Sequence, residues 1–203
     1  MTETCAQLVA RGHWAEDAAL HRCRVPYGPR NTWSNVAYPL VGWLLVLAWP
    51  GASTWVMALA MTMLGVGSGV YHATKTLFGN SLDWVGMYTT MTLAGLHAWA
   101  PRAPLPALAF CLVFSLWMGL VFSFKPGMRF DWHMAALFLV AAVPSVLYGD
   151  RRVALGAVAL FGVSYLAQRL DYERKGTGLW GHALWHVGAA LAMGALYVSR
   201  GGA

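Results

Sequence analysis

Charge is scarce in this chain, because Asp, Glu, Lys and Arg together make up only 11% of its 203 residues. Soluble domains carry about 25% charged residues, so an ordinary soluble domain is not expected. Cysteine is scarce as well, and the odd total of three argues against a disulfide-stabilised scaffold. Intrinsic disorder is excluded, because disordered chains are poor in hydrophobic residues and this chain is 58% hydrophobic.

The chain has instead several long stretches without a charged side chain. Residues 31–74 contain none over 44 residues, which is enough for two spans of about 20 residues with Pro50–Gly51 as the turn between them. Five further charge-free stretches of 16 to 24 residues follow. Isolated strands cannot satisfy their backbone hydrogen bonds in lipid. We therefore predict an all-α fold, an integral membrane bundle of seven transmembrane helices in a single domain.

The seven spans are expected at about 34–50, 55–73, 83–100, 104–124, 132–149, 153–170 and 179–199, after a polar N-terminal segment of about residues 1–33. This segment has no apolar core of the length that a signal peptide needs, so no cleaved leader is expected. No internal repeat is visible, which gives no support to a transporter.

Lysine and arginine are divided unequally between the two ends of such a bundle. The end that holds the N-terminus has ten of them and the opposite end has four. The positive-inside rule therefore predicts a cytoplasmic N-terminus and a C-terminus outside. The cationic residues are scattered over several loops, so the net charge of +6 indicates anionic lipid head groups rather than nucleic acid as the partner. No obligate protein partner is evident.

Five polar residues lie in or beside the expected spans, where ionisable groups are costly and need an explanation. His182 and His186 are four residues apart in the last span, which places both imidazoles on one helix face. Ser68 and His72 have the same spacing near the end of the second span, and Asp83 is expected to open the third. A rise of about 1.5 Å per residue brings all five to the end of the bundle that faces the cytoplasm.

Three histidines in one layer indicate a zinc ion held by His72, His182 and His186, with a fourth position open to water as in catalytic zinc sites. Bound zinc lowers the pKa of water to about 7, which supplies a nucleophile at neutral pH. Asp83 is expected to transfer the proton, and Ser68 to hydrogen-bond the water or the oxyanion. The alternative interpretation is that these histidines only form hydrogen bonds between helices.

The other histidines are not expected at this layer. His97 is about 21 Å further along its helix than Asp83. His13, His21 and His133 lie in or near expected loops and are interpreted as solvated. Large apolar residues near the site were weighed as the lining of a chamber for an acyl chain, with packing in the core as the favoured alternative: Trp84, Met87, Phe161 and Trp185.

The pattern Ser68-x3-His72, Asp83 and His182-x3-His186 resembles that of the CREST superfamily of seven-helix membrane proteins, which contains alkaline ceramidases and progestin/adiponectin-type receptors. The alkaline ceramidases are the most similar. The segments that carry this likeness are Gly67–Thr74 with Leu82–Asp83, Asn31–Asn35 (Asn-Thr-Trp-Ser-Asn) and His182–His186.

This resemblance implies a zinc-dependent amide hydrolase that cleaves ceramide or a related N-acyl lipid to a free fatty acid and an amine, by attack of zinc-bound water. It assigns zinc to His72, His182 and His186, and catalytic roles to Asp83 and Ser68. Eukaryotic alkaline ceramidases also carry an acidic calcium-binding stretch. The matching segment here, His21–Tyr27, is basic and has no carboxylate. Because calcium sites usually include carboxylates, no calcium is expected.

Two other functions stay open. One is a receptor or signalling protein of the same superfamily with a structural zinc site, and the other is a phospholipid esterase. A retinal protein is excluded, because it needs a Schiff-base lysine within a span. The three lysines, Lys75, Lys125 and Lys175, all lie in expected loops.

Overall fold

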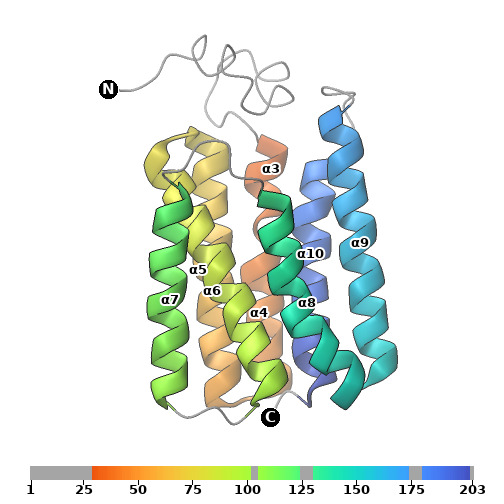
Figure 1. Ribbon diagram of the computed structural model, residues 1–203. Coiled ribbons are helices and arrows are strands. Elements are labelled where there is room, and N and C mark those ends of the chain that lie inside the picture. Colours follow the sequence, from red (N-terminus) through yellow and green to blue (C-terminus); the bar gives the residue numbers. More distant parts are fainter. Residues whose placement is uncertain (1–28, 102–104, 124–129, 174–179, 202–203) are drawn as a thin grey trace.

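The computed structural model describes residues 29–101, 105–123, 130–173 and 180–201, and over these residues the chain is helical with short turns and no strand. The helices stand side by side as an upright bundle (Figure 1). They are α3 (Pro29–Ser34), α4 (Ala37–Ala48), α5 (Ala52–Thr74), α6 (Leu77–Trp99), α7 (Leu105–Ser123), α8 (Phe130–Tyr148), α9 (Arg151–Glu173) and α10 (Gly181–Ser199). The prediction of an all-α fold is confirmed.

Two of these helices are long and apolar enough to cross a membrane by length and composition. They are α5 and the Arg151–Leu170 part of α9. Pro106–Val121 in α7 and His133–Tyr148 in α8 are apolar as well but shorter. A membrane crossing by the whole bundle stays a prediction.

The helix boundaries differ from the expected spans at two places. The end of the expected polar N-terminal segment forms a short helix, α3, and the helix of the first expected span, α4, begins only after a turn at Asn35–Val36. The third was expected to open at Asp83, but α6 begins at Leu77 and places Asp83 in its second turn. The reason is a cap at Thr76, whose hydroxyl oxygen accepts a hydrogen bond of 3.1 Å from the backbone N–H of Gly79. A threonine in this position stabilises the start of a helix.

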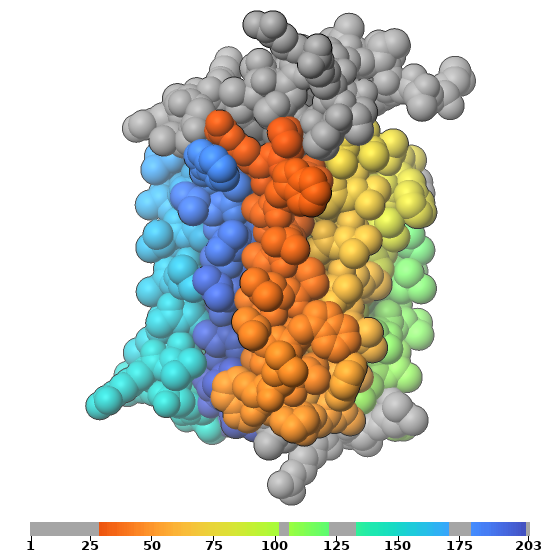
Figure 2. Space-filling model, turned by 180° about the vertical axis from the view of Figure 1, so that it is seen from behind, coloured from red at the N-terminus to blue at the C-terminus, as the bar shows by residue number. Residues whose placement is uncertain are grey.

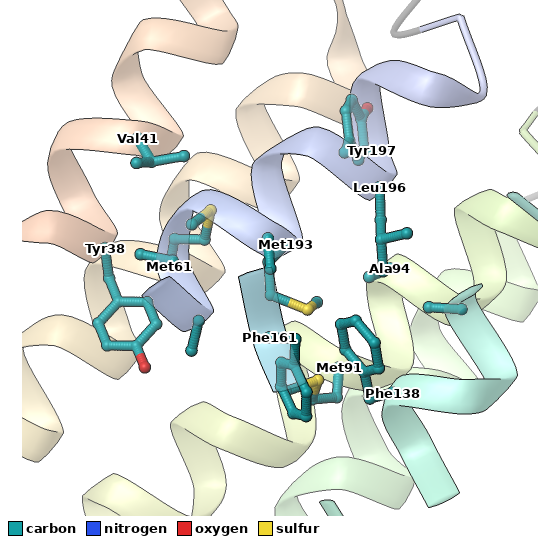
Figure 3. Close-up of a cluster of buried hydrophobic side chains, with 14 of the residues drawn as sticks. Tyr38, Val41, Met61, Met91, Ala94, Phe138, Phe161, Met193, Leu196 and Tyr197 are labelled. Atoms are coloured by element: carbon teal, nitrogen blue, oxygen red, sulfur yellow. The ribbon is translucent and has the colours of Figure 1, made fainter. Parts of the chain in front are cut away.

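A methionine-rich and aromatic cluster fills the middle of the bundle (Figure 3). Phe138 of α8 and Phe161 of α9 stack with ring centroids 3.7 Å apart, and Trp185 of α10 meets Phe161 edge-on. Trp84 and Met87 pack against the same cluster. The four residues weighed as a chamber lining therefore take part in core packing, which was the favoured alternative.

Glycine allows α5 and α6 to approach one another closely. A Cβ atom on Gly86 would lie 2.6 Å from the Cα atom of Leu64, and one on Gly67 would lie 2.8 Å from the carbonyl of Leu82. Small residues at such contacts let helix backbones meet, as is common where helices pack in membranes. The contact at Gly67 is next to Ser68 and Asp83, so it sets these two side chains opposite one another.

The last helix lies next to the first part of the chain. The space-filling view in Figure 2 shows α10 between α9 on one side and α3 and α4 on the other. In addition, α3 and α4 pack against α5. Segments far apart in the sequence, namely α3, the end of α5 and the start of α10, therefore meet at one end of the bundle.

Candidate metal centre

Three histidine rings meet at the end of the bundle where α5 ends and α10 begins. His72 lies in the last turn of α5, while His182 and His186 lie in the first two turns of α10. All three are buried, with exposed fractions of 2%, 4% and 3%. Their ring centroids are 4.7 to 5.0 Å apart, and one potential ligand atom of each lies within 4.8 Å of the others. The structure thus brings together the three predicted ligands.

The spacing of the ring nitrogens fits a zinc ion. Zinc in proteins is tetrahedral with Zn–N distances of about 2.0–2.1 Å, so two ligand nitrogens on one ion are about 3.3 Å apart. The Nε2 atoms of His72 and His182 are 3.2 Å apart, a distance that also suits a hydrogen bond between these two rings. Within the described parts of the chain, no other group of three His, Cys, Asp or Glu residues is close enough to share an ion. A donor set of three imidazoles suits zinc.

The Nδ1 atom of each imidazole has a partner from a different part of the chain. Ser34 Oγ of α3 lies 2.7 Å from Nδ1 of His186, and Gln168 Nε2 of α9 lies 3.3 Å from Nδ1 of His182. Lys75 Nζ, just after α5, lies 3.1 Å from Nδ1 of His72. Partners on the second ring nitrogen orient metal-binding histidines and select their tautomer.

The hydroxyl of Ser34 selects one tautomer of His186. This hydroxyl donates its single hydrogen to the carbonyl oxygen of Asn31 at 3.1 Å. With its hydrogen on this carbonyl, the hydroxyl accepts a hydrogen bond from His186, whose Nδ1 then carries the proton. In that tautomer the Nε2 atom of His186 carries the lone pair, which is the form that binds a metal ion. The side chain of Asn35 also bonds to the Asn31 carbonyl, at 2.6 Å, and stabilises the turn after α3.

The two predicted catalytic residues pair with each other beside the histidines. Ser68 and Asp83 are buried, with 3% and 9% of their surfaces exposed, and their side chains share a hydrogen bond. Asp83 does not belong to the group of three possible ligands. It lies within electrostatic range of Lys75 and of the Tyr38 hydroxyl. The ring of Tyr38 also approaches that of His186, with centroids 6.3 Å apart.

The sequence did not reveal the three residues that hold the Nδ1 atoms. Ser34 lies inside the Asn31–Asn35 motif, and Lys75 follows His72 by three residues, so both had a positional signal. Gln168 had none, because its place depends on how α9 packs against α10.

The remaining histidines lie elsewhere. His97 stacks on Tyr197 with ring centroids 3.9 Å apart. The two residues lie near the C-terminal ends of α6 and α10, at the end of the bundle away from the three histidines. His133 lies in the first turn of α8, near the loop where it was expected, and it is half-buried with its Nδ1 atom inside, so it is solvated only in part. His13, His21 and the basic segment 21–27, where calcium was judged absent, lie outside the described residues.

No protein-family model, curated protein or solved structure matches the chain.

Proposed function

We propose that this protein is a zinc-dependent hydrolase of the membrane that cleaves the amide bond of ceramide or a related N-acyl lipid. One observation carries the proposal: three buried imidazoles converge on one point, with the hydrogen-bonded pair of Ser68 and Asp83 on the adjoining stretch of α5 and α6. Three protein ligands leave a coordination position open, which distinguishes catalytic from structural zinc sites.

The distribution of side chains supports a bundle embedded in lipid. Large apolar side chains point outward on several helices, including Leu47 of α4, Phe110 of α7 and Val163 of α9, which are 79%, 70% and 67% exposed. Polar side chains such as Thr54 and Ser115 are fully buried. Soluble proteins seldom expose large apolar patches, and helices in membranes often use buried hydroxyl groups to hold one another.

Exposed aromatic residues at both ends of the helices also support a bundle whose helices run along the membrane normal. Trp33 and Trp180 are exposed at the end that holds the histidines, and Trp55, Trp99 and Tyr148 at the other. Tryptophan and tyrosine prefer the two interfaces of a bilayer. The twenty residues from Trp55 to Thr74 span about 30 Å of helix, close to the thickness of a hydrocarbon core.

The depth of the site suits a lipid substrate. The three histidines lie in the last turn of α5 and the first turns of α10, which is the level of the head groups in this arrangement. The amide bond of an N-acyl lipid lies at the same level, between the head group and the acyl chain. With a cytoplasmic N-terminus, as the lysine and arginine distribution predicts, the site opens to the inner leaflet.

The protein groups divide the chemistry between them. When bound, zinc supplies a Lewis acid that activates water at neutral pH. The Asp83 carboxylate is the group that accepts a proton from the attacking water and passes it to the amine that leaves. The Ser68 hydroxyl donates its hydrogen to that carboxylate and so orients it, and its oxygen can accept a hydrogen bond from the attacking water.

A lipid panel tests this proposal. The purified full chain, in nanodiscs, is incubated with acyl-labelled ceramide, other N-acyl lipids and phosphatidylcholine, with and without a chelator. We expect fatty acid release from an N-acyl lipid that the chelator stops and added zinc restores. Release from phosphatidylcholine alone would identify an esterase. Bound zinc without release from any lipid would overturn the hydrolase and favour the receptor alternative.

His97→Gln is the matched control for this assay. It changes a buried histidine at the far end of the same bundle, 6% exposed, and leaves the three-histidine cluster intact. We expect it to retain both zinc and hydrolysis.

A further inference from the structure

Of the three residues that contact the Nδ1 atoms of the histidines, Lys75 differs from Ser34 and Gln168 in the hydrogen bonds that it can form. A serine hydroxyl both donates and accepts hydrogen bonds, and a glutamine amide presents an oxygen or a nitrogen after half a turn. Ser34 and Gln168 can therefore accept a hydrogen bond from a protonated Nδ1 atom. The ammonium group of Lys75 has three donors and no acceptor. It lies 3.1 Å from Nδ1 of His72 and so can only donate to that atom.

The contact with Lys75 requires one tautomer of His72, and a metal ion on Nε2 requires the other. A donor on Nδ1 needs the lone pair of that atom, which places the ring proton on Nε2. A metal ion on Nε2 needs the lone pair there and leaves the proton on Nδ1. The Nε2 atom of His72 is the one that faces His182, at 3.2 Å. One neutral imidazole cannot satisfy Lys75 and a shared metal ion at the same time.

We propose that Lys75 is a built-in competitor of the metal, whose ammonium group must leave His72 before the third imidazole can coordinate. This inference rests on the proposed metal centre and adds a determinant of how tightly that centre binds its ion. Ser34 acts in the opposite sense, because it holds His186 in the metal-binding tautomer.

The backbone at Lys75 supports a role for this side chain. Lys75 caps α5 in the left-handed conformation, with φ of 51°, and it is the one non-glycine residue with positive φ in the described ranges. Helices that end this way usually place glycine there, because a Cβ atom is unfavourable in this region. A lysine in the position of a glycine suggests that its ammonium group matters.

Other partners for the displaced ammonium group lie close by. Lys75 Nζ lies 4.9 Å from the centroid of the Tyr71 ring, a distance that suits a cation–π contact. The Asp83 carboxylate is within electrostatic range. These two groups can compensate the charge of an ammonium group that has left the imidazole.

Zinc affinity, measured on the purified full chain by competition with a chromophoric chelator, tests the inference. We expect Lys75→Gln to bind zinc about tenfold more tightly than the wild type, because changes beside a metal ligand alter affinity by about 10–100-fold. Ser34→Ala should bind it about tenfold more weakly. Lys75→Arg retains a cation without an acceptor and should resemble the wild type.

Lys75→Gly removes the side chain and the backbone strain together, whereas Lys75→Gln removes only the ammonium group. We expect the two variants to have the same zinc affinity, which would show that the strain itself has no part in it. The absorption spectrum of the Co²⁺-loaded protein gives a second readout, and we expect Lys75→Gln to reach the tetrahedral spectrum at a lower Co²⁺ concentration. Equal or weaker zinc binding by Lys75→Gln, in a wild type that binds one zinc, would overturn the role of Lys75 alone. A wild type that binds no zinc would overturn the metal centre itself.

Discussion

Both ends of the bundle contain buried polar side chains, but they use them in opposite ways. At the end where α10 begins, three imidazoles point at one another, and each has a partner behind it on Nδ1. At the end where α10 finishes, His97 lies flat on Tyr197, with 13° between the ring planes. Arg200 there donates to the carbonyl oxygens of Ala98 and Tyr148, at 2.8 and 2.6 Å.

The difference shows what separates a site from a structural contact. Arg200 donates hydrogen bonds to backbone carbonyls at the ends of α6 and α8, and these bonds hold both helix ends beside α10. The three histidines instead have ring nitrogens that lie within 4.8 Å of one another, and the Nε2 atoms of His72 and His182 are also close enough to share a hydrogen bond. A buried histidine alone does not indicate a metal site, whereas three ring nitrogens this close together could hold one ion.

His182→Ala gives the sharpest test of this comparison and the largest expected effect. The variant loses one of three ligands, so we expect bound zinc and lipid hydrolysis both to disappear. Metal content per protein molecule, measured after gel filtration, checks the first and fatty acid release the second. His97→Ala removes the same side chain at the other end and should keep its zinc. Loss of zinc from both variants alike would show that the two ends do not differ.

Asp83→Asn separates catalysis from metal binding at the histidine end. The amide cannot accept a proton, so we expect hydrolysis to fall by about 10²–10⁴-fold while zinc stays bound. Rates of fatty acid release and metal content on the same sample provide the measurement. Zinc loss in this variant would instead make Asp83 a ligand.

Ser34→Ala is expected to have a smaller effect, on affinity alone. It removes the hydroxyl that selects the tautomer of His186, so zinc binding should weaken by about tenfold. Chelator competition measures this change. Ser164→Ala is the matched control, because Ser164 is equally buried but bonds to the carbonyl of Phe161 and not to a histidine. An equal loss in both variants would point to general loosening of the bundle.

Arg200→Met should have no effect on zinc and a moderate effect on stability. It removes two hydrogen bonds from a charged group to backbone carbonyls, and we expect the free energy of unfolding to fall by about 2 kcal/mol. Thermal unfolding in detergent measures the stability, and chelator competition the affinity. A change in zinc affinity would show that the two ends are coupled through α10.

Much of the candidate site follows from spacing along the chain. His182 and His186 share a helix face because four residues make about one turn, and Ser68 and His72 do so for the same reason. The shared level of the two pairs follows from counting residues between turns. The helix α6 begins six residues earlier than predicted, because Thr76 caps its start, and a threonine is a residue type that favours this position.

Other features could not be derived from spacing. The partner of His182 is Gln168, and that contact depends on the rotation of α9 about its own axis against α10. The hydrogen bond between Ser34 and His186 joins residues 152 positions apart. Contacts of this kind depend on packing between helices that are not neighbours in sequence, so no periodicity encodes them.

The sequence by itself determined that the chain is helical, which residues share a helix face, and at which level along the bundle each histidine lies, because these depend on helical rise and turn alone. The tertiary structure decided which ring nitrogen faces which partner, because that depends on the rotation and approach of whole helices. Small residues such as Gly67 permit that approach, and Ser34, Gln168 and Lys75 are placed by it around the three imidazoles.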